Sequence, residues 1–253
     1  MNTGEYVTIW EDFELPSKGL IYDKVIDPKV SLRSMTTAEE MKRLSPTETP
    51  YKVMSDIIED CMKDKPKIHV CDMCIGDYQF LLHKLRVVTY GKEYKMVASC
   101  PYCGNTEMIT ANLDNIDLHI WDSAAAEKKL ITLPVTNFTI ELNFQTPHDL
   151  DLIAYRAKEM KKEKKNNLDY SMLFTVMSLI KKIDGREPVN QGILKDFVWN
   201  LPTRDVIFIL NRATELAKEI GLDNNIKVDC SNCGKQFDAP FRITSEFFGP
   251  SEN

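Results

Sequence analysis

The side chains of this sequence best suited to chemistry are three pairs of cysteines with two residues between them: Cys71/Cys74, Cys100/Cys103 and Cys230/Cys233. A two-residue gap lets both thiolates of a pair reach one metal ion while the backbone turns beneath it. Tetrahedral zinc takes four such ligands, which two pairs supply. The sequence therefore predicts a zinc site, and the surroundings of each pair indicate which two pairs form it.

The two later pairs have the same surroundings. A glycine follows each second cysteine, at Gly104 and Gly234, and glycine alone takes the positive φ of a tight turn without steric cost. Strand-like segments flank both turns, at 94–99, 107–113, 226–229 and 237–243. We therefore expect one structural Zn²⁺ ion between the two halves of a split zinc ribbon. The expected metal ligands are Cys100, Cys103, Cys230 and Cys233.

The first pair stands in a different context. Cys71 and Cys74 precede a helical pattern over 75–90, and residues three apart share one helix face. Free cysteines are commonly buried, so we interpret both as core residues, and Cys61 likewise. A rival arrangement combines the first pair with the second pair at one metal ion, but it leaves the last pair unexplained.

Patterns typical of catalysis are missing from the sequence. Four thiolates close the coordination sphere of zinc, so the expected site has no open position for a reacting water. The four histidines form no spacing motif, and there is no nucleophile elbow, P-loop or dinucleotide-binding glycine pattern. A thiol oxidoreductase is an alternative, but it needs a helix that begins at the reactive cysteine and lowers its pKa. We therefore predict that the protein is not an enzyme.

Helix and strand signals surround the cysteines. A capping-box pattern lies at 36–40, and Thr146 before Pro147 is a second helix start. A β-hairpin is expected over 130–144. Apolar periodicity predicts helices over about 36–44, 50–63, 75–90, 146–165, 169–183, 191–199 and 203–220.

The expected fold class is α+β, mostly helical, with a split four-cysteine zinc ribbon and a helical module inserted between its halves. The predicted regions are an extended N-terminal arm at 1–35, a helical region at 36–93, ribbon halves at 94–113 and 226–246, an inserted module of a β-hairpin plus helices at 114–225, and an aromatic C-terminal tail at 247–253. We expect Phe247 and Phe248 to pack on this protein or on a partner, because exposed aromatic pairs mark contact sites.

The composition is that of a globular protein, since 43% of the 253 residues are hydrophobic and 28% are charged. No run approaches the roughly 20 apolar residues that span a bilayer, and residues 1–5 lack the pattern of a signal peptide. The net charge of -6 makes nucleic acid an unexpected partner. A zinc-ribbon nucleic-acid-binding adaptor is still an alternative, because five lysines lie within 158–165. We interpret these lysines as a solvated helix end.

Several segments together resemble a known family. They are Leu15–Tyr22, Leu32–Glu40, and Leu85–Gly91 leading into Cys100–Cys103. These segments are similar to the baseplate hub and hub-assembly proteins of T-even-type contractile-tailed phages. The Ile183–Gly185 segment and the last cysteine turn, followed by Phe247-Phe248, fit the same family.

The resemblance implies a non-enzymatic protein that builds or forms the central part of a tail baseplate. Its partners would be other phage tail and baseplate proteins, with a second copy of itself as a further candidate. The expected location is the host cytoplasm during assembly, and also the virion if the protein stays in the tail baseplate. The family suggests no catalytic residues.

Overall fold

The computed structural model describes residues 8–223, 225–241, 243 and 245–248. The α-helices are α1 (Thr37–Leu44), α2 (Pro50–Asp60), α3 (Ile75–Tyr90), α4 (Pro147–Lys164), α5 (Ser171–Leu179), α6 (Gln191–Trp199) and α7 (Thr203–Ala217). Short 3-10 turns are η1 (Val70–Asp72), η2 (Leu113–Asn115), η3 (Ser123–Lys129) and η4 (Ser245–Phe248). The strands are β1 (Glu11–Glu14), β2 (Lys29–Leu32), β3 (Glu93–Ser99), β4 (Thr106–Asn112), β5 (Leu118–His119), β6 (Leu130–Thr132), β7 (Thr139–Leu142), β8 (Ile180–Ile183), β9 (Gly221–Leu222), β10 (Asn225–Asp229) and β11 (Gln236–Pro240).

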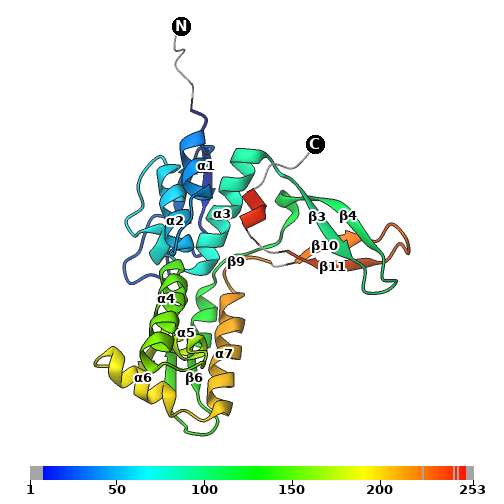
Figure 1. Cartoon of the computed structure of the whole chain (residues 1–253). Helices are drawn as coiled ribbons and strands as arrows, with labels where there is room; N and C mark the ends of the chain where they lie inside the picture. Colours follow the sequence, from blue (N-terminus) through cyan, green and yellow to red (C-terminus); the bar gives the residue numbers. More distant parts are fainter. Residues whose placement is uncertain (1–7, 224, 242, 244, 249–253) are drawn as a thin grey trace.

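These elements form a mixed α+β protein with three visible parts (Figure 1). The helices α1, α2 and α3 form the main body, and the hairpins β3–β4 and β10–β11 extend from it to one side. Below the body, α4 to α7 pack around the three-stranded sheet β6-β7-β8. The predicted mixture of helices and strands is confirmed.

The buried hydrophobic side chains form two clusters that follow these parts. The first cluster draws on 15–116 and 226–248 and includes the inner faces of α2, α3 and both hairpins. The second cluster draws on 121–220 together with Cys74 at the start of α3. The buried residues of the chain therefore leave the first cluster after Ile116 and return to it at β10.

The backbone of the two clusters meets where α3 begins. A Cβ atom added to Gly76 would lie 2.4 Å from the carbonyl oxygen of Ile220, and one added to Gly221 would lie 2.8 Å from the Cα of Gly76. Real Cβ atoms do not approach backbone this closely, so only glycine fits at either position. Close backbone packing thus fixes β9 and the residue before it, Ile220, against the start of α3.

Capping signals in the sequence mark the real helix starts. At α1 the Thr36 side chain and Glu39 form the predicted capping box, and at α4 Thr146 forms one with Asp149. The helix α3 ends at Gly91, whose φ of +83° breaks the helical path. These helix predictions are confirmed, because each depends on contacts within four residues of the chain.

Two predictions from local pattern are wrong. The helix expected over 169–183 ends at Leu179, and Ile180–Ile183 instead pairs as β8 with β7. The free edge of β7 offers backbone partners and its Glu141 forms an ion pair with Lys182 (2.9 Å), so tertiary pairing outweighs helix propensity. The N-terminal stretch expected to be extended and irregular contains the antiparallel pair β1–β2. Residues 1–7 of the predicted arm lie outside the described residues.

A buried carboxylate fastens the N-terminal stretch to α3. Asp77, fully buried near the start of α3, accepts hydrogen bonds from the Ser17 amide (2.9 Å), the Ser17 hydroxyl (2.5 Å) and the Tyr22 hydroxyl (2.5 Å). Burial raises the pKa of Asp77. The turn at 15–19 therefore lies over the body, as its proline and glycine predict.

The two aromatic residues before the chain end are buried in the same chain. Phe247 and Phe248 are 0% and 3% exposed and belong to the first cluster. The guanidinium of Arg86, also fully buried, donates to the carbonyl oxygens of Phe247 (2.7 Å) and Gly91 (2.8 Å). The aromatic pair thus packs on this protein. Residues 249–253 of the predicted tail lie outside the described residues.

We expect His83 to make folding stability fall in mild acid. His83 is 1% exposed. Its Nε2–H donates to the Leu113 carbonyl (3.0 Å), and its Nδ1 meets no partner among the described residues. Burial, and secondarily Lys84, lowers the pKa of His83 from 6.5 to about 4. Between these values the unfolded chain binds a proton that the folded chain does not, so lowering the pH from 6.5 to 4 removes about 3 kcal/mol of stability.

Urea unfolding at pH 6.5 and pH 4.5 measures this loss. The variant His83→Gln keeps a donor for Leu113 but cannot be protonated, so its stability should fall less than that of the wild type over the same interval. Equal losses in the two proteins would show that His83 does not set the acid response.

Candidate metal centre

Two turns with the same backbone geometry carry the four predicted ligands. In the turn between β3 and β4, the Cys100 amide donates to the Asn105 carbonyl (2.8 Å) and the Gly104 amide to the Cys100 carbonyl (3.0 Å). In the turn between β10 and β11, the corresponding amides of Cys230 and Gly234 donate over 3.0 and 2.9 Å. The two glycines have positive φ angles of +72° and +67°, as predicted. The repeated sequence unit is therefore a repeated structural unit.

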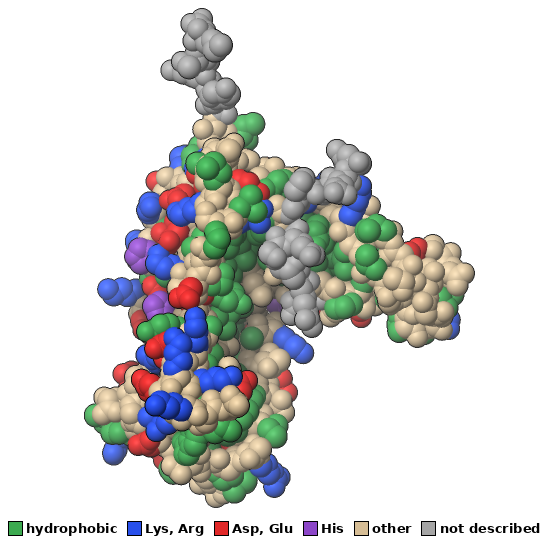
Figure 2. All heavy atoms as spheres, in the orientation of Figure 1, with side chains coloured by type: hydrophobic (Ala, Val, Ile, Leu, Met, Phe, Trp, Pro, Cys, Tyr) green, Lys and Arg blue, Asp and Glu red, His purple; other side chains and the backbone are tan. Residues whose placement is uncertain are grey.

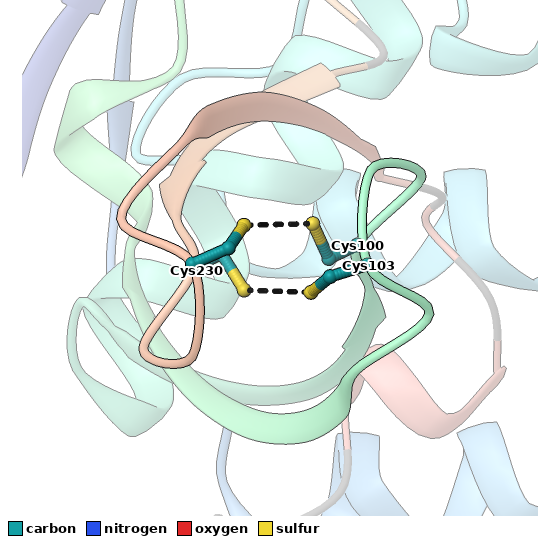
Figure 3. A group of neighbouring side chains, drawn as sticks. Cys100, Cys103 and Cys230 are labelled. Atoms are coloured by element: carbon teal, nitrogen blue, oxygen red, sulfur yellow. Dashed lines mark hydrogen bonds between the residues drawn. The ribbon is translucent and has the colours of Figure 1, made fainter.

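The two turns face each other and bring four thiols to one point (Figure 3). The Sγ atoms of Cys100 and Cys233 lie 3.8 Å apart, and those of Cys103 and Cys230 lie 3.7 Å apart. All four Sγ atoms lie within 4.8 Å of one another. Tetrahedral zinc with Zn–S bonds of about 2.3 Å holds its sulfurs about 3.8 Å apart, whereas a disulfide bond measures about 2.05 Å. Two of the sulfur–sulfur distances thus match a tetrahedral site, and the four free thiols lie close enough together to hold one metal ion.

A link that sequence reasoning missed joins the two turns beside the thiols. The carboxylate of Glu107 on β4 accepts from the amide (3.1 Å) and the hydroxyl (2.5 Å) of Ser231 in the second turn. The amide group of Asn232 lies 3.6 Å from the Cys103 sulfur. Glu107 and Ser231 are 124 positions apart, so no local pattern marks the pair. The link holds the turns in register independently of the cysteines.

The thiols influence one another's protonation. The backbone N–H of Asn105, followed by the side chain of Asn232, lowers the pKa of Cys103 to about 6. At Cys233 the backbone N–H of Lys235 also favours the thiolate, but desolvation and the neighbouring thiols together outweigh it and raise the pKa to about 11. Adjacent thiolates repel each other, and a divalent cation between them would remove that repulsion.

The other three cysteines lie apart from this cluster. Cys61 and Cys74 are buried, which confirms their prediction as core residues. Cys71 is half-exposed, and the prediction of a core position is wrong for it, because it lies on the surface turn η1 before α3 begins. Burial, followed by nearby Asp72, raises the pKa of Cys71 to about 11. Among the described residues, the first cysteine pair does not join the four-thiol group.

The lysine-rich end of α4 is a mixed surface. Lys158 pairs with Glu48 (3.0 Å) and Lys162 with Glu159 (2.8 Å). Figure 2 shows blue basic side chains interspersed with red acidic ones over the helical module. The helix ends within the lysine run, where cations complement the helix dipole. This arrangement agrees with a solvated helix end.

Fold and site define a class of protein: an α+β chain in which two distant cysteine turns meet and could hold one metal ion. The family described as T4 bacteriophage base plate protein matches residues 11–249, and the chain belongs to this family. No curated protein and no solved structure matches the chain.

The family identifies a phage baseplate protein and confirms the resemblance seen in the sequence. It suggests a structural, non-enzymatic role, with other phage tail proteins as partners and the virion tail as location. Within the part of the chain that the structure describes, no helix combines the length and apolar character that crossing a bilayer requires.

Proposed function

We propose that this chain is a structural or assembly protein of the baseplate hub, and that Cys100, Cys103, Cys230 and Cys233 hold one structural Zn²⁺ ion. The observation that carries the zinc proposal is the convergence of two cysteine turns, 127 or more positions apart, at tetrahedral sulfur spacing. Four soft thiolate donors in a closed tetrahedral set suit zinc. Family membership supports the baseplate role.

The proposed zinc ion has a structural role. Each half of the proposed zinc ribbon is only a two-stranded hairpin, and an isolated hairpin is marginally stable in water. A metal ion between the turns would hold the two hairpins together. It would thereby fix both ends of the inserted module at 114–225, whose side chains build the second cluster.

The outer face of β3–β4 supports contact with another protein. Val97 and Met108 lie opposite each other in the strand register and are 60% and 66% exposed. The hairpin extends away from the body (Figure 1), so these apolar side chains are accessible to a partner. An exposed apolar pair on a projecting hairpin is what a subunit of a larger assembly needs.

Native mass spectrometry of the purified chain tests the zinc proposal. We expect one tightly bound zinc ion that survives dialysis against a weak chelator, because a closed four-thiolate site binds strongly. A folded chain that binds no metal would contradict the four-thiolate site, and it would leave the four cysteines as free thiols.

Phage produced without this chain test the baseplate role. We expect baseplates that lack a complete hub and particles without functional tails, seen by electron microscopy of infected-cell lysates. Supplying the wild-type chain in the host should restore tails. Intact baseplates without the chain would contradict the assembly role. Mass spectrometry of purified virions then distinguishes a subunit that stays from a factor that leaves.

A further inference from the structure

A second group of metal-binding side chains lies between η1 and the start of α4. The sulfur of Cys71, a carboxylate oxygen of Asp72 and an imidazole nitrogen of His148 all lie within 4.8 Å of one another. Oδ1 of Asp72 is 3.7 Å from Nδ1 of His148. Zinc binds these three donor types at about 2.0–2.3 Å, which places ligand atoms roughly 3.3–3.8 Å apart. Small side-chain rotations would complete this spacing.

The backbone holds the first two donors in place. The Val70 amide at the start of η1 donates to the Glu59 carboxylate of α2 (2.7 Å), and the Asp72 amide donates to the His69 carbonyl (2.9 Å). The turn η1 is therefore fixed to α2 and presents two successive side chains, Cys71 and Asp72, toward α4. Donors held by a rigid backbone lose little entropy when they bind a metal.

The third donor, His148, is held in place by contacts of α4. The Ile75 amide donates to the Gln145 carbonyl (2.9 Å), which joins the segments before α3 and α4. His148 then lies in the first turn of α4, whose direction the capping box sets. Three residues further, the Asp151 carboxylate accepts from the Lys52 amide at the start of α2 (2.8 Å). The place of His148 beside η1 therefore follows from contacts that do not involve Cys71.

The charges around the thiol favour a cation. The carboxylates of Asp72, Glu59 and Asp56 lie close enough to act on Cys71, against one ammonium, Lys52. That ammonium is itself paired with Asp56 (2.8 Å). The local excess of negative charge attracts a divalent cation.

We propose that Cys71, Asp72 and His148 form a second zinc site, with a solvent water as fourth ligand. This site should be weaker than the four-thiolate site, because two of its donors are exposed and one position stays open to solvent. A zinc ion here would connect η1, next to the first cluster, with α4 of the helical module. The two sites share no ligand, so this proposal does not depend on the four-thiolate site.

Titration of the purified full chain with Co²⁺, which replaces zinc and is visible by absorption, tests the proposal. Chain already loaded with one equivalent of zinc should bind a further equivalent of Co²⁺. The new site should show one sulfur-to-cobalt charge-transfer band of the strength of a single thiolate. Binding should be lost in His148→Ala and in Cys71→Ser. It should be kept in the matched control His69→Ala, where an exposed histidine also faces a carboxylate (Glu59, 3.4 Å) but does not belong to the group of Cys71, Asp72 and His148.

Two results would overturn the second site. One is the absence of a second equivalent at millimolar Co²⁺, and the other is equal Co²⁺ binding by the wild type and His148→Ala. Circular dichroism establishes that each variant is folded, and the exposed His148 decides the outcome if Cys71→Ser does not fold. If the four thiols bound no zinc, a titration of the metal-free chain would still show one equivalent that depends on His148. Failure of one site is therefore distinguishable from failure of the other.

Discussion

Replacing Cys100 or Cys230 by serine is expected to release the proposed four-thiolate zinc ion and to unfold the projecting hairpins. Both thiols are buried, and zinc bound by four thiolates contributes on the order of 10 kcal/mol to a folded zinc domain. The hairpins contribute Ala98, Ala111, Val228 and Phe237 to the first cluster, so their loss should also lower the melting temperature by about 10 °C or more. Native mass spectrometry and differential scanning calorimetry measure the two effects.

Cys61→Ala and Cys71→Ser are the matched controls for this experiment. Cys61 is fully buried but lies apart from the four thiols, so its loss should cost some stability without releasing zinc. Cys71→Ser should leave the four-thiolate zinc in place. If Cys100→Ser kept its zinc and its melting temperature, the four thiols would not be the structural metal site.

Arg86→Met is expected to cost about 3 kcal/mol of folding stability, because it leaves the buried carbonyl oxygen of Phe247 without this donor and removes two part-buried hydrogen bonds. The guanidinium of Arg86 reaches the carbonyls of Phe247 (2.7 Å), Gly91 (2.8 Å) and Glu93 (3.3 Å). One side chain thereby joins the C-terminal aromatic pair, the end of α3 and the start of β3. Urea unfolding followed by tryptophan fluorescence measures the change.

Two comparisons show whether this effect comes from the shape of the guanidinium. Arg86→Lys keeps the charge but cannot reach three carbonyls at once, so it should be nearly as destabilising as Arg86→Met. Arg212→Met removes an arginine from an exposed pair with Glu215 and should change stability by less than about 1 kcal/mol. A loss at Arg86→Met no larger than at Arg212→Met would mean that the carbonyls of Phe247, Gly91 and Glu93 find other donors.

What the sequence could predict was whatever depends on neighbours along the chain. The spacing of Cys100 with Cys103 and the glycine after each pair predict the turn geometry, because those contacts close within six residues. Helix starts at Thr36 and Thr146 follow from capping chemistry for the same reason. The convergence of the two turns was predictable only because zinc needs four ligands and each turn supplies two.

What the sequence could not show depends on residues far apart in it. The strand at 180–183 has an apolar pattern that also suits a helix, and only the free edge of β7 decides between them. The Glu107–Ser231 link and the approach of His148 to Cys71 have no spacing signal, because packing of α4 on η1 and α2 creates the second of these contacts. The half-exposed position of Cys71 follows from the same packing.

The separation of the two cysteine turns along the chain also orders events during synthesis. Cys103 and Cys230 are 127 positions apart, which a ribosome covers in on the order of ten seconds. During that interval the first two thiols have emerged without their partners, while the helical module can already bury its own cluster. A polypeptide interrupted anywhere before Cys230 can never assemble the four-thiol group. The closed hairpin pair therefore forms only in a chain that has been translated at least as far as Cys233, and a partner that recognises it would accept only such chains.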